Sequence, residues 1–237
     1  MDNINQTNNQ TENKLTKRKF YQYWRFWFII FLIFICLIWV AISILLAYLN
    51  SRKVDISQFN SDQSVSYEKM YSSTDPSLGN PQAPLQIVEF SDFQCPYCAQ
   101  AHSIIRQLLR SYPNDVYFIY RDFPIIDIHP QAQLAAEAAQ CAFDQEKFWE
   151  YHDLLFQNQD KLDLGYLLIY AQRLNLDLEK FTNCLEIGKY RNEVQQDMSD
   201  AYDLGVRATP TFFINGQKLE GVVPYETWVE LINISKK

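Results

Sequence analysis

Residues 89–98 read Glu-Phe-Ser-Asp-Phe-Gln-Cys-Pro-Tyr-Cys, and this stretch decides the fold. An apolar run over residues 85–90 leads into it and predicts a β-strand, while the pattern over residues 99–111 predicts a helix after it. Two cysteines with two residues between them therefore lie between a strand and a helix. That arrangement is typical of thiol–disulfide chemistry.

The helix N-terminus predicts different roles for the two thiols. Its free N–H groups and partial positive charge stabilise a thiolate at the first position. We expect Cys95 to be the exposed thiolate that attacks, and Cys98, one turn further on, to be the resolving thiol. Pro96 fits the first helical turn, where its missing N–H is not needed, and Tyr97 completes the active-site loop.

A second motif lies near the C-terminus, where Thr209 and Pro210 open an apolar strand pattern over residues 211–214. A proline that opens a strand of a buried sheet requires a special backbone, and a cis peptide bond is one such case. Asn215 and Gly216 then predict a hairpin, and an amphipathic helix begins near Pro224.

With these motifs the chain resembles DsbA-like thiol:disulfide oxidoreductases. The sequence of residues 128–156 is similar to that of the helical insertion in this family. The resemblance implies an α/β class, with a thioredoxin fold that contains an inserted all-helical subdomain over about residues 127–203. It also implies that the Thr209–Pro210 bond is cis and lies against the cysteines, and that the Thr209 backbone pairs with the substrate.

Glu89 stands out because a carboxylate is costly to bury in a central strand. The resemblance implies that it lies beneath the cysteine pair and assists proton transfer to and from the buried thiol. A position on a solvated face of the sheet is the alternative. Asp92 is expected to be a turn or cap residue.

Cys141 and Cys184 lie in two different predicted helices of the insertion. Some members of the family bridge such a pair, so the resemblance implies a structural disulfide. Two free buried thiols are the alternative. A bridge would stabilise the fold by about 4 kcal/mol in the chain-entropy model.

The N-terminal part predicts a membrane anchor. Residues 1–25 are expected to form a disordered cytoplasmic tail, and residues 26–49 are 24 positions without a charge, enough to cross a bilayer. A cleaved signal peptide is the competing interpretation, but its apolar region is shorter and ends in small residues. Five basic residues before the run place the N-terminus in the cytoplasm. Residues 50–80 are predicted to be a linker and 81–237 the DsbA-like domain.

Charge argues against a nucleic-acid partner. The net charge is −7. Residues 1–49 hold 5 basic and 2 acidic residues, a balance of +3, so the remainder carries −10. Phosphate binding needs a basic face, which an acidic body does not supply.

The three histidines of the chain are candidates for a metal site or for structural roles. His102 follows Cys98 by one helical turn, so a zinc site from Cys95, Cys98 and His102 is conceivable, although the sequence offers no fourth ligand. An ordinary place on the helix surface is the simpler interpretation of His102. We expect His129 and His152 to finish helix ends or to pack at edges.

Together these patterns predict a membrane-tethered, extracytoplasmic oxidase that introduces disulfides into exported proteins by exchange at Cys95 and Cys98. The exchange needs no cofactor, and the resemblance implies a membrane redox partner of the DsbB or vitamin-K-epoxide-reductase (VKOR) type. Pro96-Tyr97 is also the glutaredoxin dipeptide, so a reductase or an isomerase stays an alternative. A non-catalytic thioredoxin-fold binding module and a metal carrier for a copper protein are hypotheses of other classes.

Overall fold

The computed structural model describes residues 27–28, 30–46, 70–72 and 74–236, and the chain divides into the compact units Met1–Val54 and Asp55–Lys237. In the first unit the described positions, 27–28 and 30–46, are helical and lie inside the apolar run. No helix among the described residues combines the length and the apolar character that a membrane crossing requires. The predicted tail over 1–25 and most of the predicted linker lie outside the described residues.

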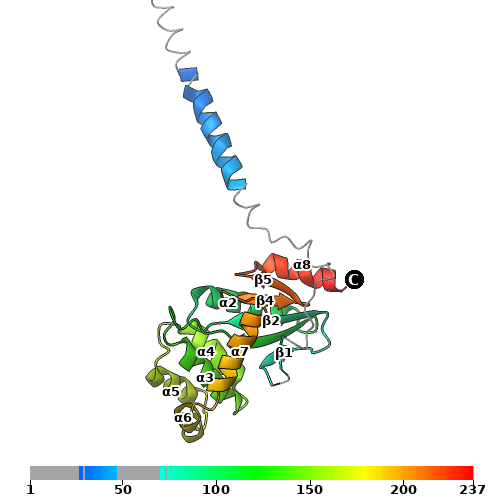
Figure 1. Cartoon of the computed structure of the whole chain (residues 1–237). Coiled ribbons are helices and arrows are strands. Elements are labelled where there is room, and N and C mark those ends of the chain that lie inside the picture. Colours follow the sequence, from blue (N-terminus) through cyan, green and yellow to red (C-terminus); the bar gives the residue numbers. More distant parts are fainter. Residues whose placement is uncertain (1–26, 29, 47–69, 73, 237) are drawn as a thin grey trace, which may run out of the picture. The chain divides into compact units, whose positions relative to one another are not determined.

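The second unit is built on a mixed sheet with the strand order β1-β3-β2-β4-β5 (Figure 1). Its central strands β2 and β3 are parallel, and every other pairing is antiparallel. Helix α2 connects β2 to β3, which makes the βαβ unit that the sequence predicts. The bounds of these elements are β1 Ser77–Gly79, β2 Leu85–Ser91, α2 Pro96–Ser111, β3 Val116–Asp122, β4 Thr211–Ile214 and β5 Gln217–Glu220.

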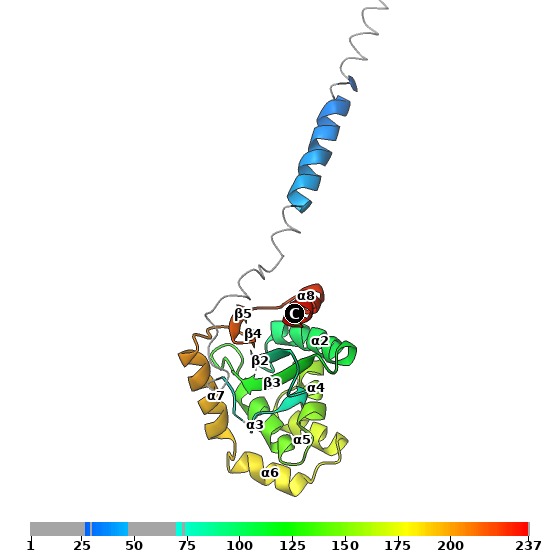
Figure 2. The same cartoon turned by 90° about the vertical axis from the view of Figure 1, so that its right-hand side faces the viewer.

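Five helices lie between β3 and β4, within the block predicted to be helical. They are α3 Ala132–Phe143, α4 Phe148–Gln157, α5 Leu164–Arg173, α6 Leu178–Glu186 and α7 Arg191–Asp203. Six alanines of α3 are buried, and their small side chains let this helix pack closely in the core. Figures 1 and 2 show α5 and α6 at the end of the domain away from the sheet. This architecture is the α/β thioredoxin fold with a helical insertion that the sequence predicts.

Each face of the sheet packs against its own apolar cluster. Leu85 and Ile87 of β2 belong to the larger cluster with α2, α3, α4 and the C-terminal helix α8 (Tyr225–Ser235). Val88 and Phe90, on the opposite face, belong to a smaller cluster to which α7 contributes. Figure 2 shows α8 beside α2. Residues on the face of β2 that points toward α2 therefore lie on the same side of the sheet as Cys95 and Cys98.

The predicted linker over residues 50–80 extends too far into the domain. Ser77–Gly79 forms β1 and pairs with β3, and the Met70 side chain is fully buried in the smaller cluster. Gly79 has φ +94°, and a Cβ there would lie 2.2 Å from the Val116 carbonyl oxygen. Gly79 is thus the point where the edge strand β1 approaches β3.

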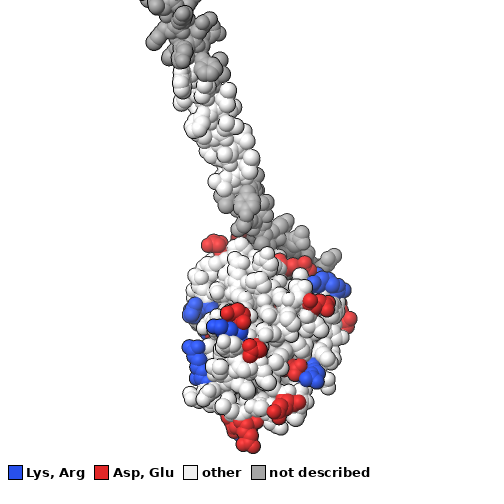
Figure 3. Space-filling model, turned by 90° about the vertical axis from the view of Figure 1, so that its left-hand side faces the viewer, with Lys and Arg blue, Asp and Glu red and all other residues white. Residues whose placement is uncertain are grey.

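Charged side chains are mixed on the face of this unit that Figure 3 presents. Acidic and basic groups are interspersed there between broad uncharged areas, and a few acidic groups gather at the lower end of the unit in this view.

Candidate active site

The two cysteines stand at the start of α2, as the sequence predicts. Cys95 is the N-cap and Pro96 follows at the first helical position. Cys95 is reduced and only 5% exposed, so the expectation of an exposed thiol is wrong. Its Sγ lies 3.6 Å from the Thr209 carbonyl oxygen, to which the thiol donates when it is protonated. The Thr209–Pro210 turn therefore covers the sulfur that the sequence alone places on the surface.

The strand pairing brings this turn to the cysteines. The Thr209–Pro210 peptide bond is cis, as the resemblance implies, and β4 begins directly after it. β4 pairs antiparallel with β2, with Phe90 opposite Thr211. Because β2 ends just before the Cys-x-x-Cys loop, the sheet register holds Thr209 beside Cys95 although 114 residues separate them.

The surroundings of Cys95 stabilise its thiolate. A hydrogen bond from the Cys98 thiol is the largest influence that lowers the pKa of Cys95, to about 5, and the backbone N–H groups of Cys98 and Tyr97 act in the same direction. These N–H groups belong to the open first turn of α2, where a helix favours negative charge. At neutral pH the Cys95 sulfur is thus an ionised nucleophile and a good leaving group.

Cys98 behaves in the opposite way. Its side chain is fully buried, and burial raises its pKa well above the ordinary value, with smaller contributions from Cys95 and Glu89. The backbone N–H of Asp92 donates to its sulfur over 3.5 Å. Cys98 therefore holds its proton at neutral pH, and it must gain or lose that proton whenever the disulfide opens or closes.

Glu89 lies within the core of the domain. It is 2% exposed, so the alternative of a solvated face is wrong. Burial raises the pKa of Glu89 to about 8, and the charge of Cys95 acts in the same direction. A carboxyl group with this pKa can give or take a proton near neutral pH, and its effect on the pKa of Cys98 shows that the two groups interact.

Tyr97 is the exposed part of the active-site loop, with 63% of its surface accessible. In the sequence it lies between the two buried cysteines, so the active-site loop reaches solvent at this residue.

Two polar residues that the sequence did not single out hold the loop. The Gln159 amide donates to the carbonyl oxygens of Phe93 and Cys95, over 2.8 Å in each case, and so ties the insertion to the active site. Gln94 accepts from the Gln131 N–H over 2.9 Å. A lone glutamine after a helix carries no sequence signal, because its role depends on a contact with a distant segment.

Asp92 is a turn residue, as the sequence predicts, and it also connects the loop before the cysteines to the loop after β3. One carboxylate oxygen accepts from the Gln94 N–H over 2.7 Å. The other accepts from the Ile125 N–H and lies 2.8 Å from Nδ1 of His129. His129 thus packs at an edge of the site, against the loop that precedes the cysteines.

The other two histidines form a separate cluster with Asp153. His102 Nε2 and His152 Nδ1 lie 2.8 and 3.3 Å from one Asp153 oxygen, and Arg106 contacts the other oxygen over 3.0 Å. Among the described residues, His102 is therefore grouped with His152 and Asp153 as a possible metal ligand, rather than with the cysteines. Burial lowers the pKa of His152 to about 4, so this side chain is a neutral member of the aromatic core.

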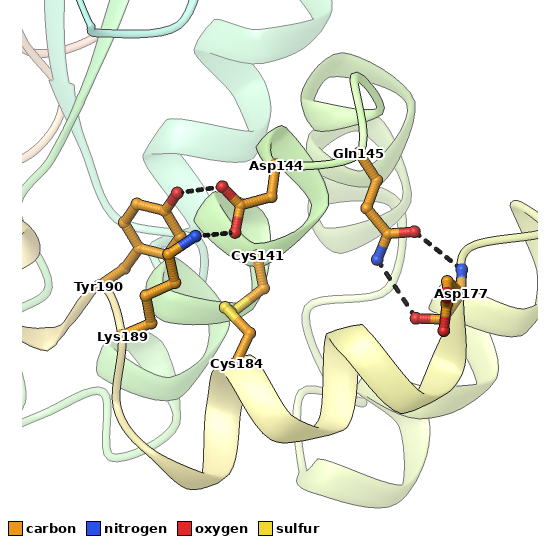
Figure 4. The surroundings of a disulfide bond; sticks show 7 residues. All are labelled: Cys141, Asp144, Gln145, Asp177, Cys184, Lys189 and Tyr190. Atoms are coloured by element: carbon orange, nitrogen blue, oxygen red, sulfur yellow. Dashed lines mark hydrogen bonds and ion pairs between the residues drawn. A yellow bond between two sulfur atoms is a disulfide. The ribbon is translucent and has the colours of Figure 1, made fainter.

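Two further cysteines form a disulfide in the insertion (Figure 4). Cys141 of α3 and Cys184 of α6 are bonded, and both are buried. Asp144 accepts from Lys189 and from the Tyr190 hydroxyl beside this bond. The structure thus contains one structural cross-link and one reduced pair at the head of a helix.

Known proteins share the fold that carries this site. The family model described as "Thioredoxin" matches residues 71–234. A thioredoxin-like oxidoreductase from Silicibacter pomeroyi superposes with a TM-score of 0.65 at 27% identity, covering 73% of this chain and 98% of that one. BdbD from Bacillus subtilis, in its oxidised form, gives 0.61 at 25% identity over 68% of this chain and 92% of its own. Wolbachia pipientis alpha-DsbA1 shares the fold, with a TM-score of 0.62 at 24% identity, covering 70% of this chain and 92% of that one.

Curated relatives include much longer proteins. Na(+)/H(+) antiporter NhaA 3 of Salinispora tropica is 47% identical over 148 residues, which are 62% of this chain and 22% of that protein. The NhaA antiporter of Herminiimonas arsenicoxydans is 33% identical over 159 residues, 67% of this chain and 25% of that protein. The chain thus spans about a quarter of the length of the curated relatives it matches.

Proposed function

Because the chain belongs to the thioredoxin family, we propose that it is a thiol:disulfide oxidoreductase that introduces disulfides into exported proteins. One observation carries the proposal. The pKa of Cys95 is lowered to about 5 while that of Cys98 is raised, and the Cys95 sulfur lies 3.6 Å from the Thr209 carbonyl oxygen of a cis Thr–Pro bond. A stabilised Cys95 thiolate favours the reduced pair, and a protein whose reduced form is stabilised is an oxidant.

The reaction begins from the oxidised pair. A substrate thiolate attacks the Cys95 sulfur, a mixed disulfide forms, and the Cys95–Cys98 bond breaks with its electron pair on Cys98. Glu89 supplies the proton that Cys98 then needs. A second substrate thiolate attacks the substrate sulfur of the mixed disulfide and releases Cys95 as a thiolate. The substrate leaves as a disulfide, and the protein keeps one thiolate and one thiol.

The Thr209 carbonyl contributes to substrate binding in this proposal. Its oxygen lies 3.6 Å from the Cys95 sulfur, so a substrate strand bonded to Cys95 would lie next to the Thr209 backbone and pair with it. The exchange itself uses only sulfur and proton chemistry, so it requires no cofactor. A membrane protein of the DsbB or VKOR type would restore the Cys95–Cys98 disulfide by taking two electrons from it.

A membrane location with the catalytic unit outside the cytoplasm is part of the same proposal. It is supported by the uncharged run over residues 26–49 and by the five basic residues before it. The test is to express the full chain in bacteria and to treat spheroplasts with a protease. Loss of the catalytic unit from a membrane-bound product supports the proposal, and recovery of the chain in the soluble cytoplasmic fraction contradicts it.

The reduction potential of the Cys95–Cys98 pair decides the direction. The full chain is equilibrated with glutathione mixtures, and the state of each cysteine is read by mass spectrometry. We expect a potential near about −120 mV, in the range of strong disulfide donors. A potential below about −230 mV would assign a reductase instead, and a pair that never exchanges would favour the non-catalytic binding module.

A further inference from the structure

Four buried oxygen atoms beside the active site have no hydrogen-bond partner among the described residues. They are Oε1 of Glu89, Oγ of Ser91, the phenol oxygen of Tyr120 and Oδ1 of Asp122. Their residues are 2%, 1%, 0% and 1% exposed. Buried polar atoms are nearly always hydrogen-bonded, by protein or by ordered water. Four exceptions in one place therefore need a common explanation.

The strand register gathers these atoms into one cluster. Glu89 is paired with Tyr120, and Ser91 with Asp122, in the parallel ladder of β2 and β3. Paired residues of neighbouring strands point to the same face and lie about 4.8 Å apart. All four side chains thus point to the α2 side of the sheet, where Cys98 is buried.

Tyr120 lies at the centre of the cluster. After burial, the groups that raise the pKa of its phenol are Asp122, Glu89, Cys98 and Asp92, in that order. Its ring is held by Phe93 and His152, with centroid distances of 5.2 and 4.9 Å. The apolar part of the side chain is therefore packed firmly, while the hydroxyl faces the acids and the resolving thiol.

We propose that the Tyr120 hydroxyl is a positioning residue that holds water between Glu89 and Asp122 and relays protons between Cys98 and Asp122. Water that bridges several buried polar groups is a normal part of protein interiors. This inference rests on the proposed function, since it describes how the proton of that reaction travels. It adds Tyr120 and Asp122 to the route that begins at Glu89.

The relay supplies the proton that the Cys98 sulfur needs when the disulfide opens. When a substrate thiolate bonds to Cys95, the electron pair of the broken bond stays on the Cys98 sulfur. As Cys98 takes a proton from the Glu89 carboxyl group, Glu89 regains one from Asp122 in the same step through the water that Tyr120 holds. No charged carboxylate is then left at Glu89 in the core, and the opening of the disulfide depends on the whole path. The tyrosine hydroxyl gives one proton as it accepts another, so it stays neutral throughout.

Asp122 is suited to the outer end of this path. The Gln140 amide donates to its Oδ2 over 2.8 Å, and burial raises its pKa to about 8, close to that of Glu89. Its backbone N–H donates to Asp197 over 2.9 Å. Asp197 and Glu193 line a surface cavity of about 420 Å³ between α7 and residues 71–75. Asp122 therefore stands between the cysteine pair and a route to solvent.

The groups that face Tyr120 predict the pH profile. They come from every side: Glu89 from β2, Asp92 from the following loop, Cys98 from α2, Asp122 from β3 itself and His152 from α4. His152 is neutral above about pH 4. Only Glu89 and Asp122 change charge near pH 8, so the relay predicts an inflection there in the rate of disulfide opening.

Tyr120→Phe tests the relay, since it removes the hydroxyl and keeps the ring. The full-length oxidised chain is mixed in a stopped-flow instrument with an aromatic thiol that is fully ionised from pH 6 to 9. We expect the rate constant of disulfide opening to fall at least about tenfold below pH 8, because general acid catalysis contributes about 10² or more. We also expect the inflection near pH 8 to be lost, while the unfolding midpoint changes little, because phenylalanine keeps the ring packing against Phe93 and His152.

Tyr151→Phe is the matched control. Tyr151 is also fully buried, but its hydroxyl donates to the Leu167 carbonyl over 2.9 Å, away from the cysteines. We expect this variant to lose stability and to keep the parent rate and pH profile. Asp122→Asn is a second test of the relay. We expect this variant also to lose the inflection near pH 8 in the rate of disulfide opening.

Three results have distinct meanings. A Tyr120→Phe variant with the parent rate and profile overturns the relay and leaves the proposed function standing. A slow variant that keeps the inflection also overturns it, since the hydroxyl then affects packing and not proton transfer. A parent chain whose disulfide does not react with thiols at all contradicts the proposed function itself.

Discussion

The chemistry of single residues in this site depends on what lies beside each sulfur. Cys95 and Cys98 are the same side chain three positions apart, yet their pKa values move in opposite directions. Cys95 receives hydrogen bonds from a thiol and from free helix N–H groups, whereas Cys98 is surrounded by apolar core and by acids. The difference arises from the position of the helix start and not from the residue type.

Cys98→Ala tests this explanation. The hydrogen bond from Cys98 is the largest influence that lowers the pKa of Cys95, so its loss should move the midpoint of Cys95 ionisation from about 5 toward 9. The thiolate absorbance of the full chain near 240 nm, followed against pH, measures the shift. If the midpoint stays near 5, the N–H groups of α2 alone stabilise the thiolate.

At the scale of elements, α7 is joined to the sheet by a buried ionic contact. Arg121 of β3 donates to Asp197 and Asp200 of α7, and it also contacts Asp75. Arg121 is 3% exposed. The Arg121 guanidinium group thus contacts three carboxylates that come from segments far apart in the sequence.

Arg121→Leu should destabilise the fold strongly. Breaking a buried ion pair by removing one partner typically costs about 3–5 kcal/mol, because the other charges stay buried and unpaired. Chemical denaturation measures this loss. Lys147→Leu is the control, because the side chains of Lys147 and its partner Glu150 are both exposed, so little change is expected. Equal effects of the two variants would contradict the explanation.

Elements near the cysteines were predictable, because local patterns define them. The apolar run of β2, the Cys-x-x-Cys spacing, the alanine pattern of α3 and the hairpin at Asn215 each follow from neighbouring residues. Gln159 and the burial of Met70 were not predictable, because each depends on a contact between distant segments. The position of Thr209 against Cys95 followed only from the family resemblance. Glu89 was noticed because a charge in an apolar strand is unusual, but only the packing of α2 decides which face it occupies.

At the scale of the whole molecule, buried acids make stability depend on pH. Glu89 and Asp122 have pKa values of about 8, and Glu193 about 9, in each case because of burial. The folded chain therefore keeps protons that the unfolded chain has already lost above about pH 4.5. Whenever the native state binds more protons, stability falls as pH rises.

Glu89→Gln should reduce this dependence. In the oxidised full chain, where the cysteines do not titrate, the gain in unfolding free energy over the parent should grow with pH from about 4.5 to 8 and then level off. One proton corresponds to at most about 1.4 kcal/mol per pH unit. Urea denaturation at a series of pH values measures the gain. A constant gain across this range would show that Glu89 does not hold a proton in the folded chain.

The insertion between β3 and β4 also has a consequence for synthesis. Cys95 and Thr209 are 114 residues apart, so the chain emerges with its reactive pair first and the carbonyl that covers it last. Between these two events Cys141 and Cys184 appear and must find each other. All five cysteines of the chain are thus synthesised before the active site is closed. The two-residue spacing of Cys95 and Cys98 keeps these thiols close together at every stage, so an oxidant that meets the nascent chain pairs them before it pairs Cys141 with Cys184.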